Sequence, residues 1–473
     1  MIKFILNNQT IKTEKEEGSS LLDFIRTEMH LTATKIGCRE GDCGACTVLE
    51  GRLVDGVLTY KSIVSCLTPL ANAHAKHIVT VEGLNLDDLS PVQNAMSESS
   101  ATQCGFCTPG FVVALTGHLL SSHNSAAVNS LSGNICRCTG YKSIEKAAGK
   151  VDELKQNLLF GSEIEQMIKE GWLPDYFSGI KNRLVEIEAI MTDMDGILIS
   201  GGTDIMVQQA DGLRHKKFVR AGDFITDNVT EENGNIKIGA GITINDFFRN
   251  RLIMEHLPQL SEFLPLIASE QIRNMGTLAG NIVNASPIGD ISIMLLAFNS
   301  SLVLENKDSR QRQLALKDFF VSYKKTRLKP DEIIKHILIS ADMDMNFNFE
   351  KVSKRTYLDI ASVNTSLGIT VDNKLIKEVY FSAGGVAAVP KFMLQSSGFL
   401  KGKELSIPTL ESVLPVIQSE ISPISDIRGG SIYKRLLLRQ LFLQHFLKLF
   451  PDEFEQKDLL NIMITNSLHD EKY

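Results

Sequence analysis

The chain has 473 residues, of which 43% are hydrophobic and 22% are charged, an ordinary composition for a globular protein. This length is too great for one hydrophobic core, so we expect three or more domains. A net charge of −7 without a basic run weighs against a nucleic-acid-binding surface, and the lack of an apolar run of about 18 residues weighs against a membrane span.

The chain begins with the elements of a small α+β domain. "IKFIL", residues 2–6, alternates as a strand does, and Asn7 and Asn8 can form the turn that follows. "SSLLDFIRTEM", residues 19–29, predicts a short amphipathic helix capped by Ser19 or Ser20. The opening residues show no signal-peptide pattern, so we expect a cytoplasmic protein.

All eight cysteines lie in the first 140 residues. A disulfide framework would suit a small secreted domain and not the start of a cytosolic chain of this length. Eight cysteines instead make two complete sets of four metal ligands. The first set has the plant-type spacing for a [2Fe–2S] cluster and consists of Cys38, Cys43, Cys46 and Cys66. Gly37, Gly41 and Gly44 allow a tight loop around such a cluster. Structural zinc is the weaker alternative, because it favours paired C-x2–4-C knuckles.

The second set joins a C-x2-C turn to a C-x-C turn. Cys104 and Cys107 lie in "QCGFCTPG", and Cys136 and Cys138 lie in "GNICRCTGY". The stretches 111–122 and 141–159 repeat apolar residues with a helical period, so we expect a small helical bundle that brings the two turns together. Spacing alone leaves zinc and iron–sulfur equally open at this set.

The motifs "CREGDCGACTVLEG", "QCGFCTPG" and "GNICRCTGY", in this order, resemble the two iron–sulfur modules of the molybdenum hydroxylases. This is the family of xanthine dehydrogenases and aldehyde oxidoreductases, and the resemblance covers residues 1 to about 158. It implies two [2Fe–2S] clusters, the plant-type one nearer a flavin and the helical one nearer a molybdenum cofactor. The ligands would be Cys38, Cys43, Cys46 and Cys66 for the first cluster, and Cys104, Cys107, Cys136 and Cys138 for the second.

Residues 159 to about 178 are expected to be a linker into a new domain. In "GILISGGTDIMVQQ", residues 196–209, a short apolar strand, a Gly-Gly turn and a helix N-terminus could bind a phosphate. That pattern alone is weak, because Gly-Gly after a strand is usually an ordinary turn. "RNMGTLAGNIVNASPIGD", residues 273–290, is too polar for core and is typical of a ligand-lining loop, with an irregular surface connection as the alternative. No G-x-G-x-x-G follows a strand, which weighs against a Rossmann domain.

Together the two stretches resemble the FAD-binding domain of the same family. The resemblance implies that a pyrophosphate is cradled by Leu198, Ile199, Ser200, Gly201, Gly202, Thr203, Asp204 and Ile205, and by Thr277, Leu278, Ala279, Gly280 and Asn281. Asp290 would accept hydrogen bonds from the adenosine ribose, Leu328 would border the flavin, and Lys351 would reach it. Ile267 departs from the aromatic residue that relatives often carry near the isoalloxazine.

The end of the chain predicts a further α+β domain. "ASVNTSLGITV" and "IKEVYFSAGGVA" predict antiparallel strands joined at "DNK", and residues 430–450 predict a closing amphipathic helix. With "DIRGGSIYKR" this resembles the domain that follows the FAD domain in the family. We therefore expect a multidomain α+β chain: a plant-type ferredoxin β-grasp domain (1–83), a helical [2Fe–2S] domain (84–158), an FAD-binding α+β domain (170–346) and a C-terminal α+β domain (347–460).

This order matches the small subunit of the bacterial xanthine dehydrogenases, enzymes of purine catabolism. The resemblance implies an oxidoreductase subunit that transfers electrons from a molybdenum cofactor on a large molybdopterin-binding partner, through both clusters to FAD and then to NAD+. No catalytic acid or base is expected on this chain. The alternatives are the equivalent subunit of an aldehyde, nicotinate, carbon monoxide or hydroxybenzoyl-CoA oxidoreductase and, from another class, a zinc-stabilised interaction scaffold.

Overall fold

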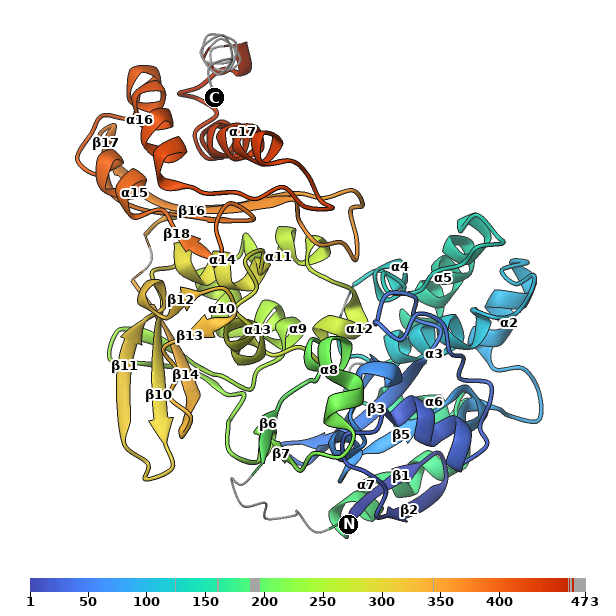
Figure 1. Ribbon diagram of the computed structural model, residues 1–473. Coiled ribbons are helices and arrows are strands. Elements are labelled where there is room, and N and C mark those ends of the chain that lie inside the picture. The colour runs from blue at the N-terminus through green and yellow to red at the C-terminus, as the bar shows by residue number, and fades with distance from the viewer. Residues whose placement is uncertain are drawn as a thin grey trace. The chain divides into compact units, whose positions relative to one another are not determined.

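The computed structural model describes residues 1–123, 125–159, 161–187, 196–342, 344–457, 459 and 462, and the chain forms two compact units (Figure 1). The first unit consists of Met1–Phe224, Thr243–Asn245 and Ala268–Gly276, and the second of Ile225–Ile242, Asp246–Ile267 and Thr277–Tyr473. Residues 188–195 and 343 of the expected FAD-binding domain, and residues 458 and 460 of the expected C-terminal domain, lie outside the described residues.

A five-stranded sheet opens the first unit, as the sequence predicts for a β-grasp domain. The sheet order is β2-β1-β5-β3-β4, in which β1 and β5 are parallel and the other neighbours antiparallel. The strands are β1 (Ile2–Leu6), β2 (Gln9–Thr13), β3 (Thr47–Val54), β4 (Val57–Val64) and β5 (His77–Val79). The predicted turn after β1 is confirmed, with Asn7 at a φ of 51°.

The predicted helix after β2 is also present, and Ser20 rather than Ser19 is its cap. The Ser20 hydroxyl accepts a hydrogen bond from the Asp23 N–H at 3.1 Å. The helix begins as α1 (Leu21–Asp23) and continues as a π-helical turn, Phe24–Glu28.

Four helices follow the sheet in the chain and include both predicted ones. They are α2 (Pro91–Glu98), α3 (Thr108–Leu119), α4 (Ala127–Ser130) and α5 (Lys142–Lys155). Phe111 and Leu115 of α3 and Ile144 and Val151 of α5 are almost completely buried in one core, which is the pattern that the helical period predicts.

The segment expected to be a linker is partly helical and partly buried. It contains α6 (Glu163–Lys169) and a 3-10 turn (Asp175–Gly179), after which α7 (Ile180–Val185) follows. Phe177 is 1% exposed, and Trp172 packs on the same core. Aromatic residues stabilise a fold most when they are buried, so the "GWLPDYF" sequence extends the core of the first unit instead of only joining two domains.

The first unit also contains the predicted strand, glycine turn and helix. β6 (Ile197–Ile199) pairs in parallel with β7 (Phe218–Arg220), and α8 (Ile205–Leu213) lies between them in the chain. The short helix α12 (Glu270–Arg273) belongs to this unit too, although it comes from the expected FAD-binding segment.

The second unit begins with an antiparallel sheet of order β11-β10-β14-β9-β8. Its strands are β8 (Val229–Glu232), β9 (Asn235–Gly239), β10 (Ser301–Asn306), β11 (Gln311–Ala315) and β14 (Glu332–Ser340), and β12 (Phe320–Ser322) pairs with β13 (Lys325–Thr326). The helices of this part of the chain are α9 (Ile244–Arg249), α10 (Arg251–His256), α11 (Leu260–Phe263), α13 (Leu278–Asn284) and α14 (Asp290–Ala297).

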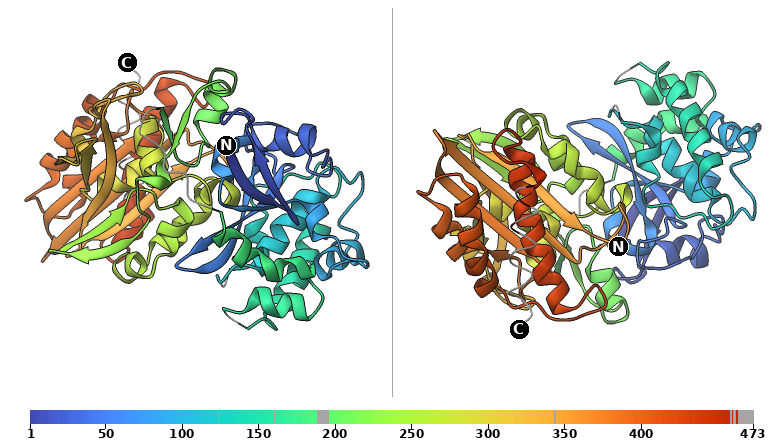
Figure 2. Two further views of the ribbon diagram at one scale, coloured as in Figure 1. Left: turned by 90° about the horizontal axis from the view of Figure 1, so that it is seen from below. Right: turned by 90° about the horizontal axis from the view of Figure 1, so that it is seen from above.

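A second sheet, of order β15-β16-β17-β18, forms the C-terminal part and contains the predicted hairpin. Its elements are β15 (Asn346–Val352), β16 (Val363–Asp372), β17 (Leu375–Gly384), β18 (Lys391–Phe392), α15 (Leu394–Leu400), α16 (Ile407–Glu420) and α17 (Ser431–Leu449). Helix α17 lies across the strands (Figure 2). Phe381 packs on Phe442 of α17, whereas the Ser382 hydroxyl donates to the Ile293 carbonyl of α14 at 2.7 Å. Because successive residues of a strand face opposite sides, α17 and α14 cover opposite faces of this sheet.

In the described part of the chain, no helix combines the length and the apolar character that crossing a bilayer would need.

His77, on β5, has a buried imidazole. Its Nδ1 lies 2.7 Å from the Tyr60 hydroxyl, and its Nε2 lies 2.9 Å from the Asn7 carbonyl oxygen. Burial lowers the pKa of His77 to about 3, whereas an unfolded chain has a histidine pKa of about 6.5. The unfolded chain therefore takes up a proton first as the pH falls. The contribution of this residue to stability is fully present above pH 6.5 and is lost as the pH falls toward 3.

We expect this histidine to lower the free energy of unfolding of the first unit by about 2 kcal/mol between pH 7 and pH 5. Trp172, the only tryptophan, packs on the core that contains Tyr60, so its fluorescence in urea follows this unit. A His77→Phe variant should lose this part of the pH dependence. Equal pH dependences in the two proteins would contradict a buried, neutral His77.

Candidate functional site

The structure brings the first cysteine set together at one end of the first sheet. Cys38, Cys43 and Cys46 lie on the loop before β3, and Cys66 lies in the turn after β4. The Cys43 thiol is hydrogen-bonded to the Cys38 sulfur, and Cys66 is bonded in the same way to Cys46. The four sulfur atoms thus form two pairs.

Each pair in this loop contains one sulfur that is stabilised as a thiolate. The hydrogen bond from Cys43 and the N–H groups of Glu40 and Asp42, 3.3 and 3.2 Å from the Cys38 sulfur, lower the pKa of Cys38 to about 5. The pKa of Cys43 rises because its thiol is the donor. By the same mechanism the pKa of Cys46 is lowered and that of Cys66 is raised.

The glycines of the loop have two different roles. Gly41 and Gly44 adopt φ values of 79° and 65°, which side chains other than glycine rarely tolerate. Gly37 has no such angle, but a Cβ atom there would lie 2.5 Å from the Cys43 sulfur. Glycine is needed at this position because any side chain would collide with the Cys43 sulfur.

The second cysteine set also forms two pairs, as the sequence predicts for the two turns. Cys104 pairs with Cys138, and Cys107 pairs with Cys136. Burial raises the pKa of Cys107 to about 12. Burial is the largest single effect on Cys136 and acts to raise its pKa. The hydrogen bonds from the Thr139 hydroxyl, 3.2 Å from the sulfur, from the Thr139 and Cys138 N–H groups and from the Cys107 thiol together outweigh burial and lower the pKa.

Both sets suit a cluster in which two cysteines bind each of two irons. No group of three or more His, Cys, Asp or Glu residues is arranged around a single metal ion in the residues that the structure describes. A [2Fe–2S] cluster shares four cysteines between its two irons and is tuned by hydrogen bonds to sulfur. Paired sulfurs that accept backbone N–H groups fit that requirement.

The first predicted FAD stretch, Leu198–Ile205, lies in the first unit. Gly201 is packed so closely on residue 275 that a Cβ atom would lie 2.0 Å from the Met275 carbonyl oxygen. Gly202 has a φ of 80°, and the Ser200 carbonyl accepts a hydrogen bond from the Asn72 side chain at 2.7 Å. The turn is therefore tight and firmly held, with its backbone close to the backbone at residue 275.

The second predicted stretch, Thr277–Asn281, lies in the second unit at the start of α13. The Thr277 hydroxyl caps the helix by accepting from the Gly280 N–H at 3.1 Å. Leu328, two residues after the end of β13, is half-buried in the same unit.

The structure brings Asp290 and Lys351 together in one ion pair. The Lys351 ammonium lies 2.7 Å from one Asp290 oxygen and also donates to the Leu266 carbonyl at 2.7 Å. The Asn364 amide donates to the other Asp290 oxygen at 2.5 Å. A carboxylate offers about four acceptor positions, so these two bonds leave room for ribose hydroxyls.

Sequence reasoning missed several residues beside the cysteines. The Tyr141 hydroxyl accepts from the Cys136 N–H at 3.1 Å. Asn134 links the two cysteine loops by donating to the Gly44 carbonyl, and Gln271 donates to Asn134. Thr139, Tyr141 and Asn134 lie inside or beside the cysteine motif, where their hydrogen-bonding groups were a visible signal. Gln271 had no such signal, because its partners are distant in sequence.

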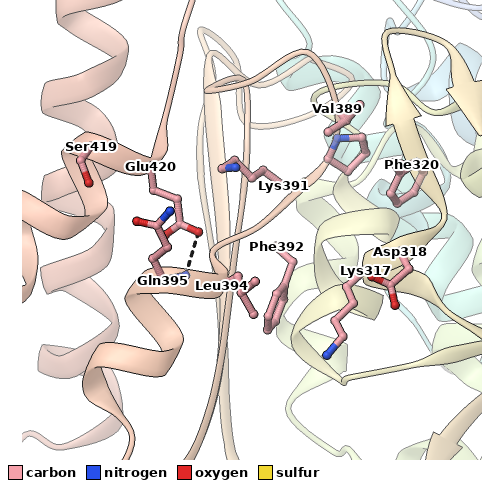
Figure 3. Close-up of a pocket in the computed structure, with 11 residues that line it drawn as sticks. Lys317, Asp318, Phe320, Val389, Lys391, Phe392, Leu394, Gln395, Ser419 and Glu420 are labelled. Atoms are coloured by element: carbon pink, nitrogen blue, oxygen red, sulfur yellow. Dashed lines mark hydrogen bonds between the residues drawn. The ribbon is translucent and has the colours of Figure 1, made fainter.

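A hollow of about 610 Å³ in the second unit contains none of the predicted residues (Figure 3). The Glu420 carboxylate beside it accepts from the Gln395 N–H at 2.9 Å, and the Lys317 ammonium lies 5.7 Å from the centre of the Phe392 ring. These charged groups have partners within the fold, and we assign no function to the hollow.

Four family models match the chain in sequence order. They describe a 2Fe-2S iron-sulfur cluster binding domain (residues 4–71), a [2Fe-2S] binding domain (80–149), an FAD binding domain in molybdopterin dehydrogenase (183–340) and a CO dehydrogenase flavoprotein C-terminal domain (349–449). These domains, in this order, are consistent with the iron–sulfur and flavin portion of a molybdenum hydroxylase. It contains two [2Fe–2S]-binding domains and one FAD-binding domain, and the expected multidomain α+β fold is confirmed.

Two xanthine dehydrogenases that are similar to this chain are longer than it. Xanthine dehydrogenase 1 of Arabidopsis thaliana is 27% identical over 90% of this chain and 38% of its own length. Xanthine dehydrogenase of Emericella nidulans is 27% identical over 99% of this chain and 40% of its own length. The chain thus spans less than half of these relatives.

Solved structures share the fold of part of the chain. Carbon monoxide dehydrogenase from Hydrogenophaga pseudoflava matches with a TM-score of 0.50 and 22% identity, over 53% of this chain and 88% of the matched chain. The enzyme from Oligotropha carboxidovorans matches with the same TM-score and identity, over 55% of this chain and 92% of the matched chain.

A Cys43→Ser variant of this chain should lose one cluster and keep the other. The two sets have separate hydrogen-bond donors, so their reduced-state electron paramagnetic resonance (EPR) signals should be distinct. We expect about half of the iron and one signal to disappear. Cys104→Ser is the reciprocal control, and loss of both signals from either variant would contradict two independent sites.

A Gly201→Ala variant should bind FAD more weakly. The new Cβ atom would meet a backbone oxygen, and such overpacking costs about 1–3 kcal/mol. If the displaced turn contacts the cofactor, FAD retention should fall by roughly ten- to a hundredfold, measured by flavin release on dilution. Gly212→Ala in α8 is the matched control, because a Cβ atom there meets nothing within 4 Å. Equal retention by both variants would mean that the turn is misassigned.

Proposed function

We propose that this chain is the electron-transfer subunit of a molybdenum hydroxylase, and that the enzyme is an NAD-dependent xanthine dehydrogenase. In this proposal electrons from a molybdenum cofactor on a large molybdopterin-binding partner pass through the two cluster sites to FAD and NAD+. The observation that carries it is the pairing of two four-cysteine sets in one compact unit, on a chain that continues into an FAD-binding domain.

The proposal gives the chain's residues the task of holding cofactors, and no residue acts as a catalytic acid or base. Cys38, Cys43, Cys46 and Cys66 hold one cluster, and Cys104, Cys107, Cys136 and Cys138 hold the other. Leu198–Ile205, Thr277–Asn281, Asp290, Leu328 and Lys351 hold FAD, which when bound supplies the exchange between one- and two-electron transfer. The proposed domains are residues 1–83, 84–158, 170–346 and 347–460, in a cytoplasmic protein.

Exposed apolar residues near the second cysteine set support a lasting partner. Phe106, Ile135 and Tyr141 are 47%, 41% and 38% exposed, and Cys104 and Cys138 beside them are exposed as well. A cluster at the surface needs a partner that excludes water and holds the donor close, and exposed apolar groups of this kind mark interaction sites. We therefore expect the large chain to cover this face in a hetero-oligomer.

The substrate follows from the relatives and not from this chain. The named relatives are xanthine dehydrogenases, which favours a purine. The match of residues 349–449 to a CO dehydrogenase flavoprotein domain keeps carbon monoxide as the alternative. Aldehydes, nicotinate and hydroxybenzoyl-CoA remain within the same family.

The test compares the purified chain with the complex that it forms with its molybdopterin partner. The chain alone should reduce an artificial dye with NADH and should not oxidise xanthine, and the complex should oxidise xanthine with NAD+. Cys104→Ser is the matched control: it should keep the NADH–dye reaction, which needs only FAD, and lose xanthine oxidation. Purine oxidation by the lone chain would refute the subunit assignment. A complex that oxidises only carbon monoxide or aldehydes would refute xanthine as the substrate and identify one of those compounds instead.

A further inference from the structure

The two cysteine loops are joined by a backbone hydrogen bond. The Ile135 N–H donates to the Cys43 carbonyl oxygen at 3.0 Å. Ile135 directly precedes Cys136 in the chain. A path from a cysteine of the first set to a cysteine of the second therefore crosses covalent bonds and this single hydrogen bond.

The Asn134 side chain holds this junction in place. It is 6% exposed, and its amide donates to the Gly44 carbonyl at 3.1 Å and lies 3.4 Å from the Thr47 hydroxyl. Gly110 of α3 also approaches this junction so closely that a Cβ atom would lie 2.4 Å from the Gly44 oxygen and 3.0 Å from the Asn134 side-chain nitrogen. The loop that carries Ile135 thus has little freedom to shift against the loop that carries Cys43.

Gln271 of α12 in turn orients Asn134. Its side-chain amide donates to the Asn134 side-chain oxygen at 2.9 Å and to the Ser130 backbone carbonyl at 3.0 Å. Gly133 leaves room for it, because a Cβ atom there would lie 2.2 Å from the Gln271 oxygen. Gln271 has no exposed surface, so these bonds exist in a site without solvent.

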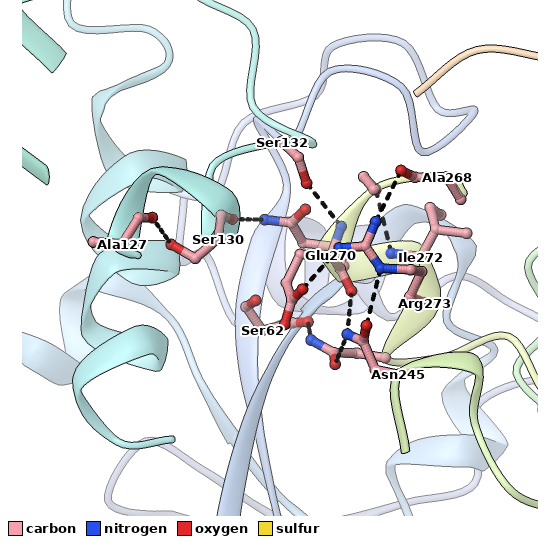
Figure 4. A network of polar contacts seen from close by, with 12 residues as sticks. Ser62, Ala127, Ser130, Ser132, Asn245, Ala268, Glu270, Ile272 and Arg273 are labelled. Atoms are coloured by element: carbon pink, nitrogen blue, oxygen red, sulfur yellow. Dashed lines mark hydrogen bonds and ion pairs between the residues drawn. The ribbon is translucent and has the colours of Figure 1, made fainter. Parts of the chain in front are cut away.

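Helix α12 is itself fixed to both cysteine domains (Figure 4). The Glu270 N–H donates to the Ser132 hydroxyl at 3.0 Å, and the Asn274 side chain donates to the Ser62 carbonyl of β4 at 2.8 Å. The Arg273 guanidinium lies 2.9 Å from the Glu270 carboxylate and 2.9 Å from the Asn245 side-chain oxygen. One turn of helix thereby holds the loop of the second set against the first sheet.

The buried Gln271 side chain does not form all the hydrogen bonds that it could. Its carbonyl oxygen has no hydrogen-bond partner among the described residues. A buried acceptor without a partner lowers stability, and such groups call for an explanation beyond stability. The two donations to Asn134 and Ser130 are what this side chain provides.

We propose that Asn134, oriented by Gln271, is a positioning residue for electron transfer between the two cluster sites. It keeps the loops at the separation at which the Ile135–Cys43 hydrogen bond forms. One electron leaves one cluster site and arrives at the other, and no bond or proton moves with it. This inference rests on the proposed function, but it concerns only the step inside the first unit.

The test uses Asn134→Leu in the full chain with its clusters and FAD. Leucine is close to asparagine in shape, the Gly44 carbonyl keeps the Thr47 hydroxyl as a donor at 2.6 Å, and Gln271 keeps Ser130 as an acceptor. The variant should therefore fold. Asn348→Leu is the matched control, because Asn348 is 4% exposed and its amide also forms two hydrogen bonds, in the second unit.

We expect Asn134→Leu to keep its iron content and both cluster potentials while the rate between clusters falls by roughly tenfold or more. The rate is followed by freeze-quench EPR after mixing with limiting dithionite. The magnetic splitting between the two reduced clusters should change as well, and amide exchange at Ile135 should become faster. Asn348→Leu should change none of these, and Gln271→Met should show the same effects in weaker form.

An unchanged intercluster rate and splitting in Asn134→Leu would overturn the proposal and leave Asn134 a structural residue. If Asn134→Leu binds no iron, Gln271→Met decides, because it alters no residue of either loop: an unchanged rate in that variant refutes the proposal. Failure of the NADH–dye or xanthine reactions would instead count against the proposed function and leave the intercluster measurement valid.

Discussion

In both cysteine sets, sulfur atoms that repel one another when charged have to lie close together, and the loop of the first set meets this constraint by hydrogen bonding. In the first set the sulfurs share protons in pairs, which is why the pKa of Cys38 falls while that of Cys43 rises. Backbone N–H groups from Glu40 and Asp42 offset the remaining charge. Such donors are available only where the backbone turns sharply, and Gly41 and Gly44 provide the turns.

The parts of the fold that depend on neighbours in sequence were predictable. The cysteine spacing indicated both sets, and the hydrophobic periods indicated α3, α5 and the β16–β17 hairpin. Where two residues were equally suitable, as with Ser19 and Ser20, only the geometry of the first turn decides, since the Ser20 hydroxyl is the one that accepts from Asp23. The residue types show which side chains could cap the helix, and the backbone geometry determines which of them does.

The parts that depend on distant partners were not predictable. Gln271 was assigned no role from the sequence, and Arg273 begins a stretch that was predicted to be too polar for core, yet both side chains are at most 3% exposed. Gln271 bonds to residues more than a hundred positions away in the sequence, and Arg273 bonds to Asn245, 28 positions away. Likewise Asp290 and Lys351 were assigned separate tasks, because nothing in the sequence reveals that β15 and α14 place them 2.7 Å apart. Removing either partner of such a buried pair leaves a charge without compensation, which typically costs about 3–5 kcal/mol.

The contacts of helix α12 bear on whether the iron–sulfur and flavin portions could be separate polypeptides. Its residues come from the flavin portion of the sequence, but their hydrogen-bond partners Ser62, Ser130 and Ser132 come from the iron–sulfur portion. If the two portions were separate polypeptides, these contacts of α12 would form only when the two chains bind, and binding would cost translational and rotational freedom. On a single chain the helix is already present at a high effective concentration. With both portions on one chain, these contacts form without the cost of association between two subunits.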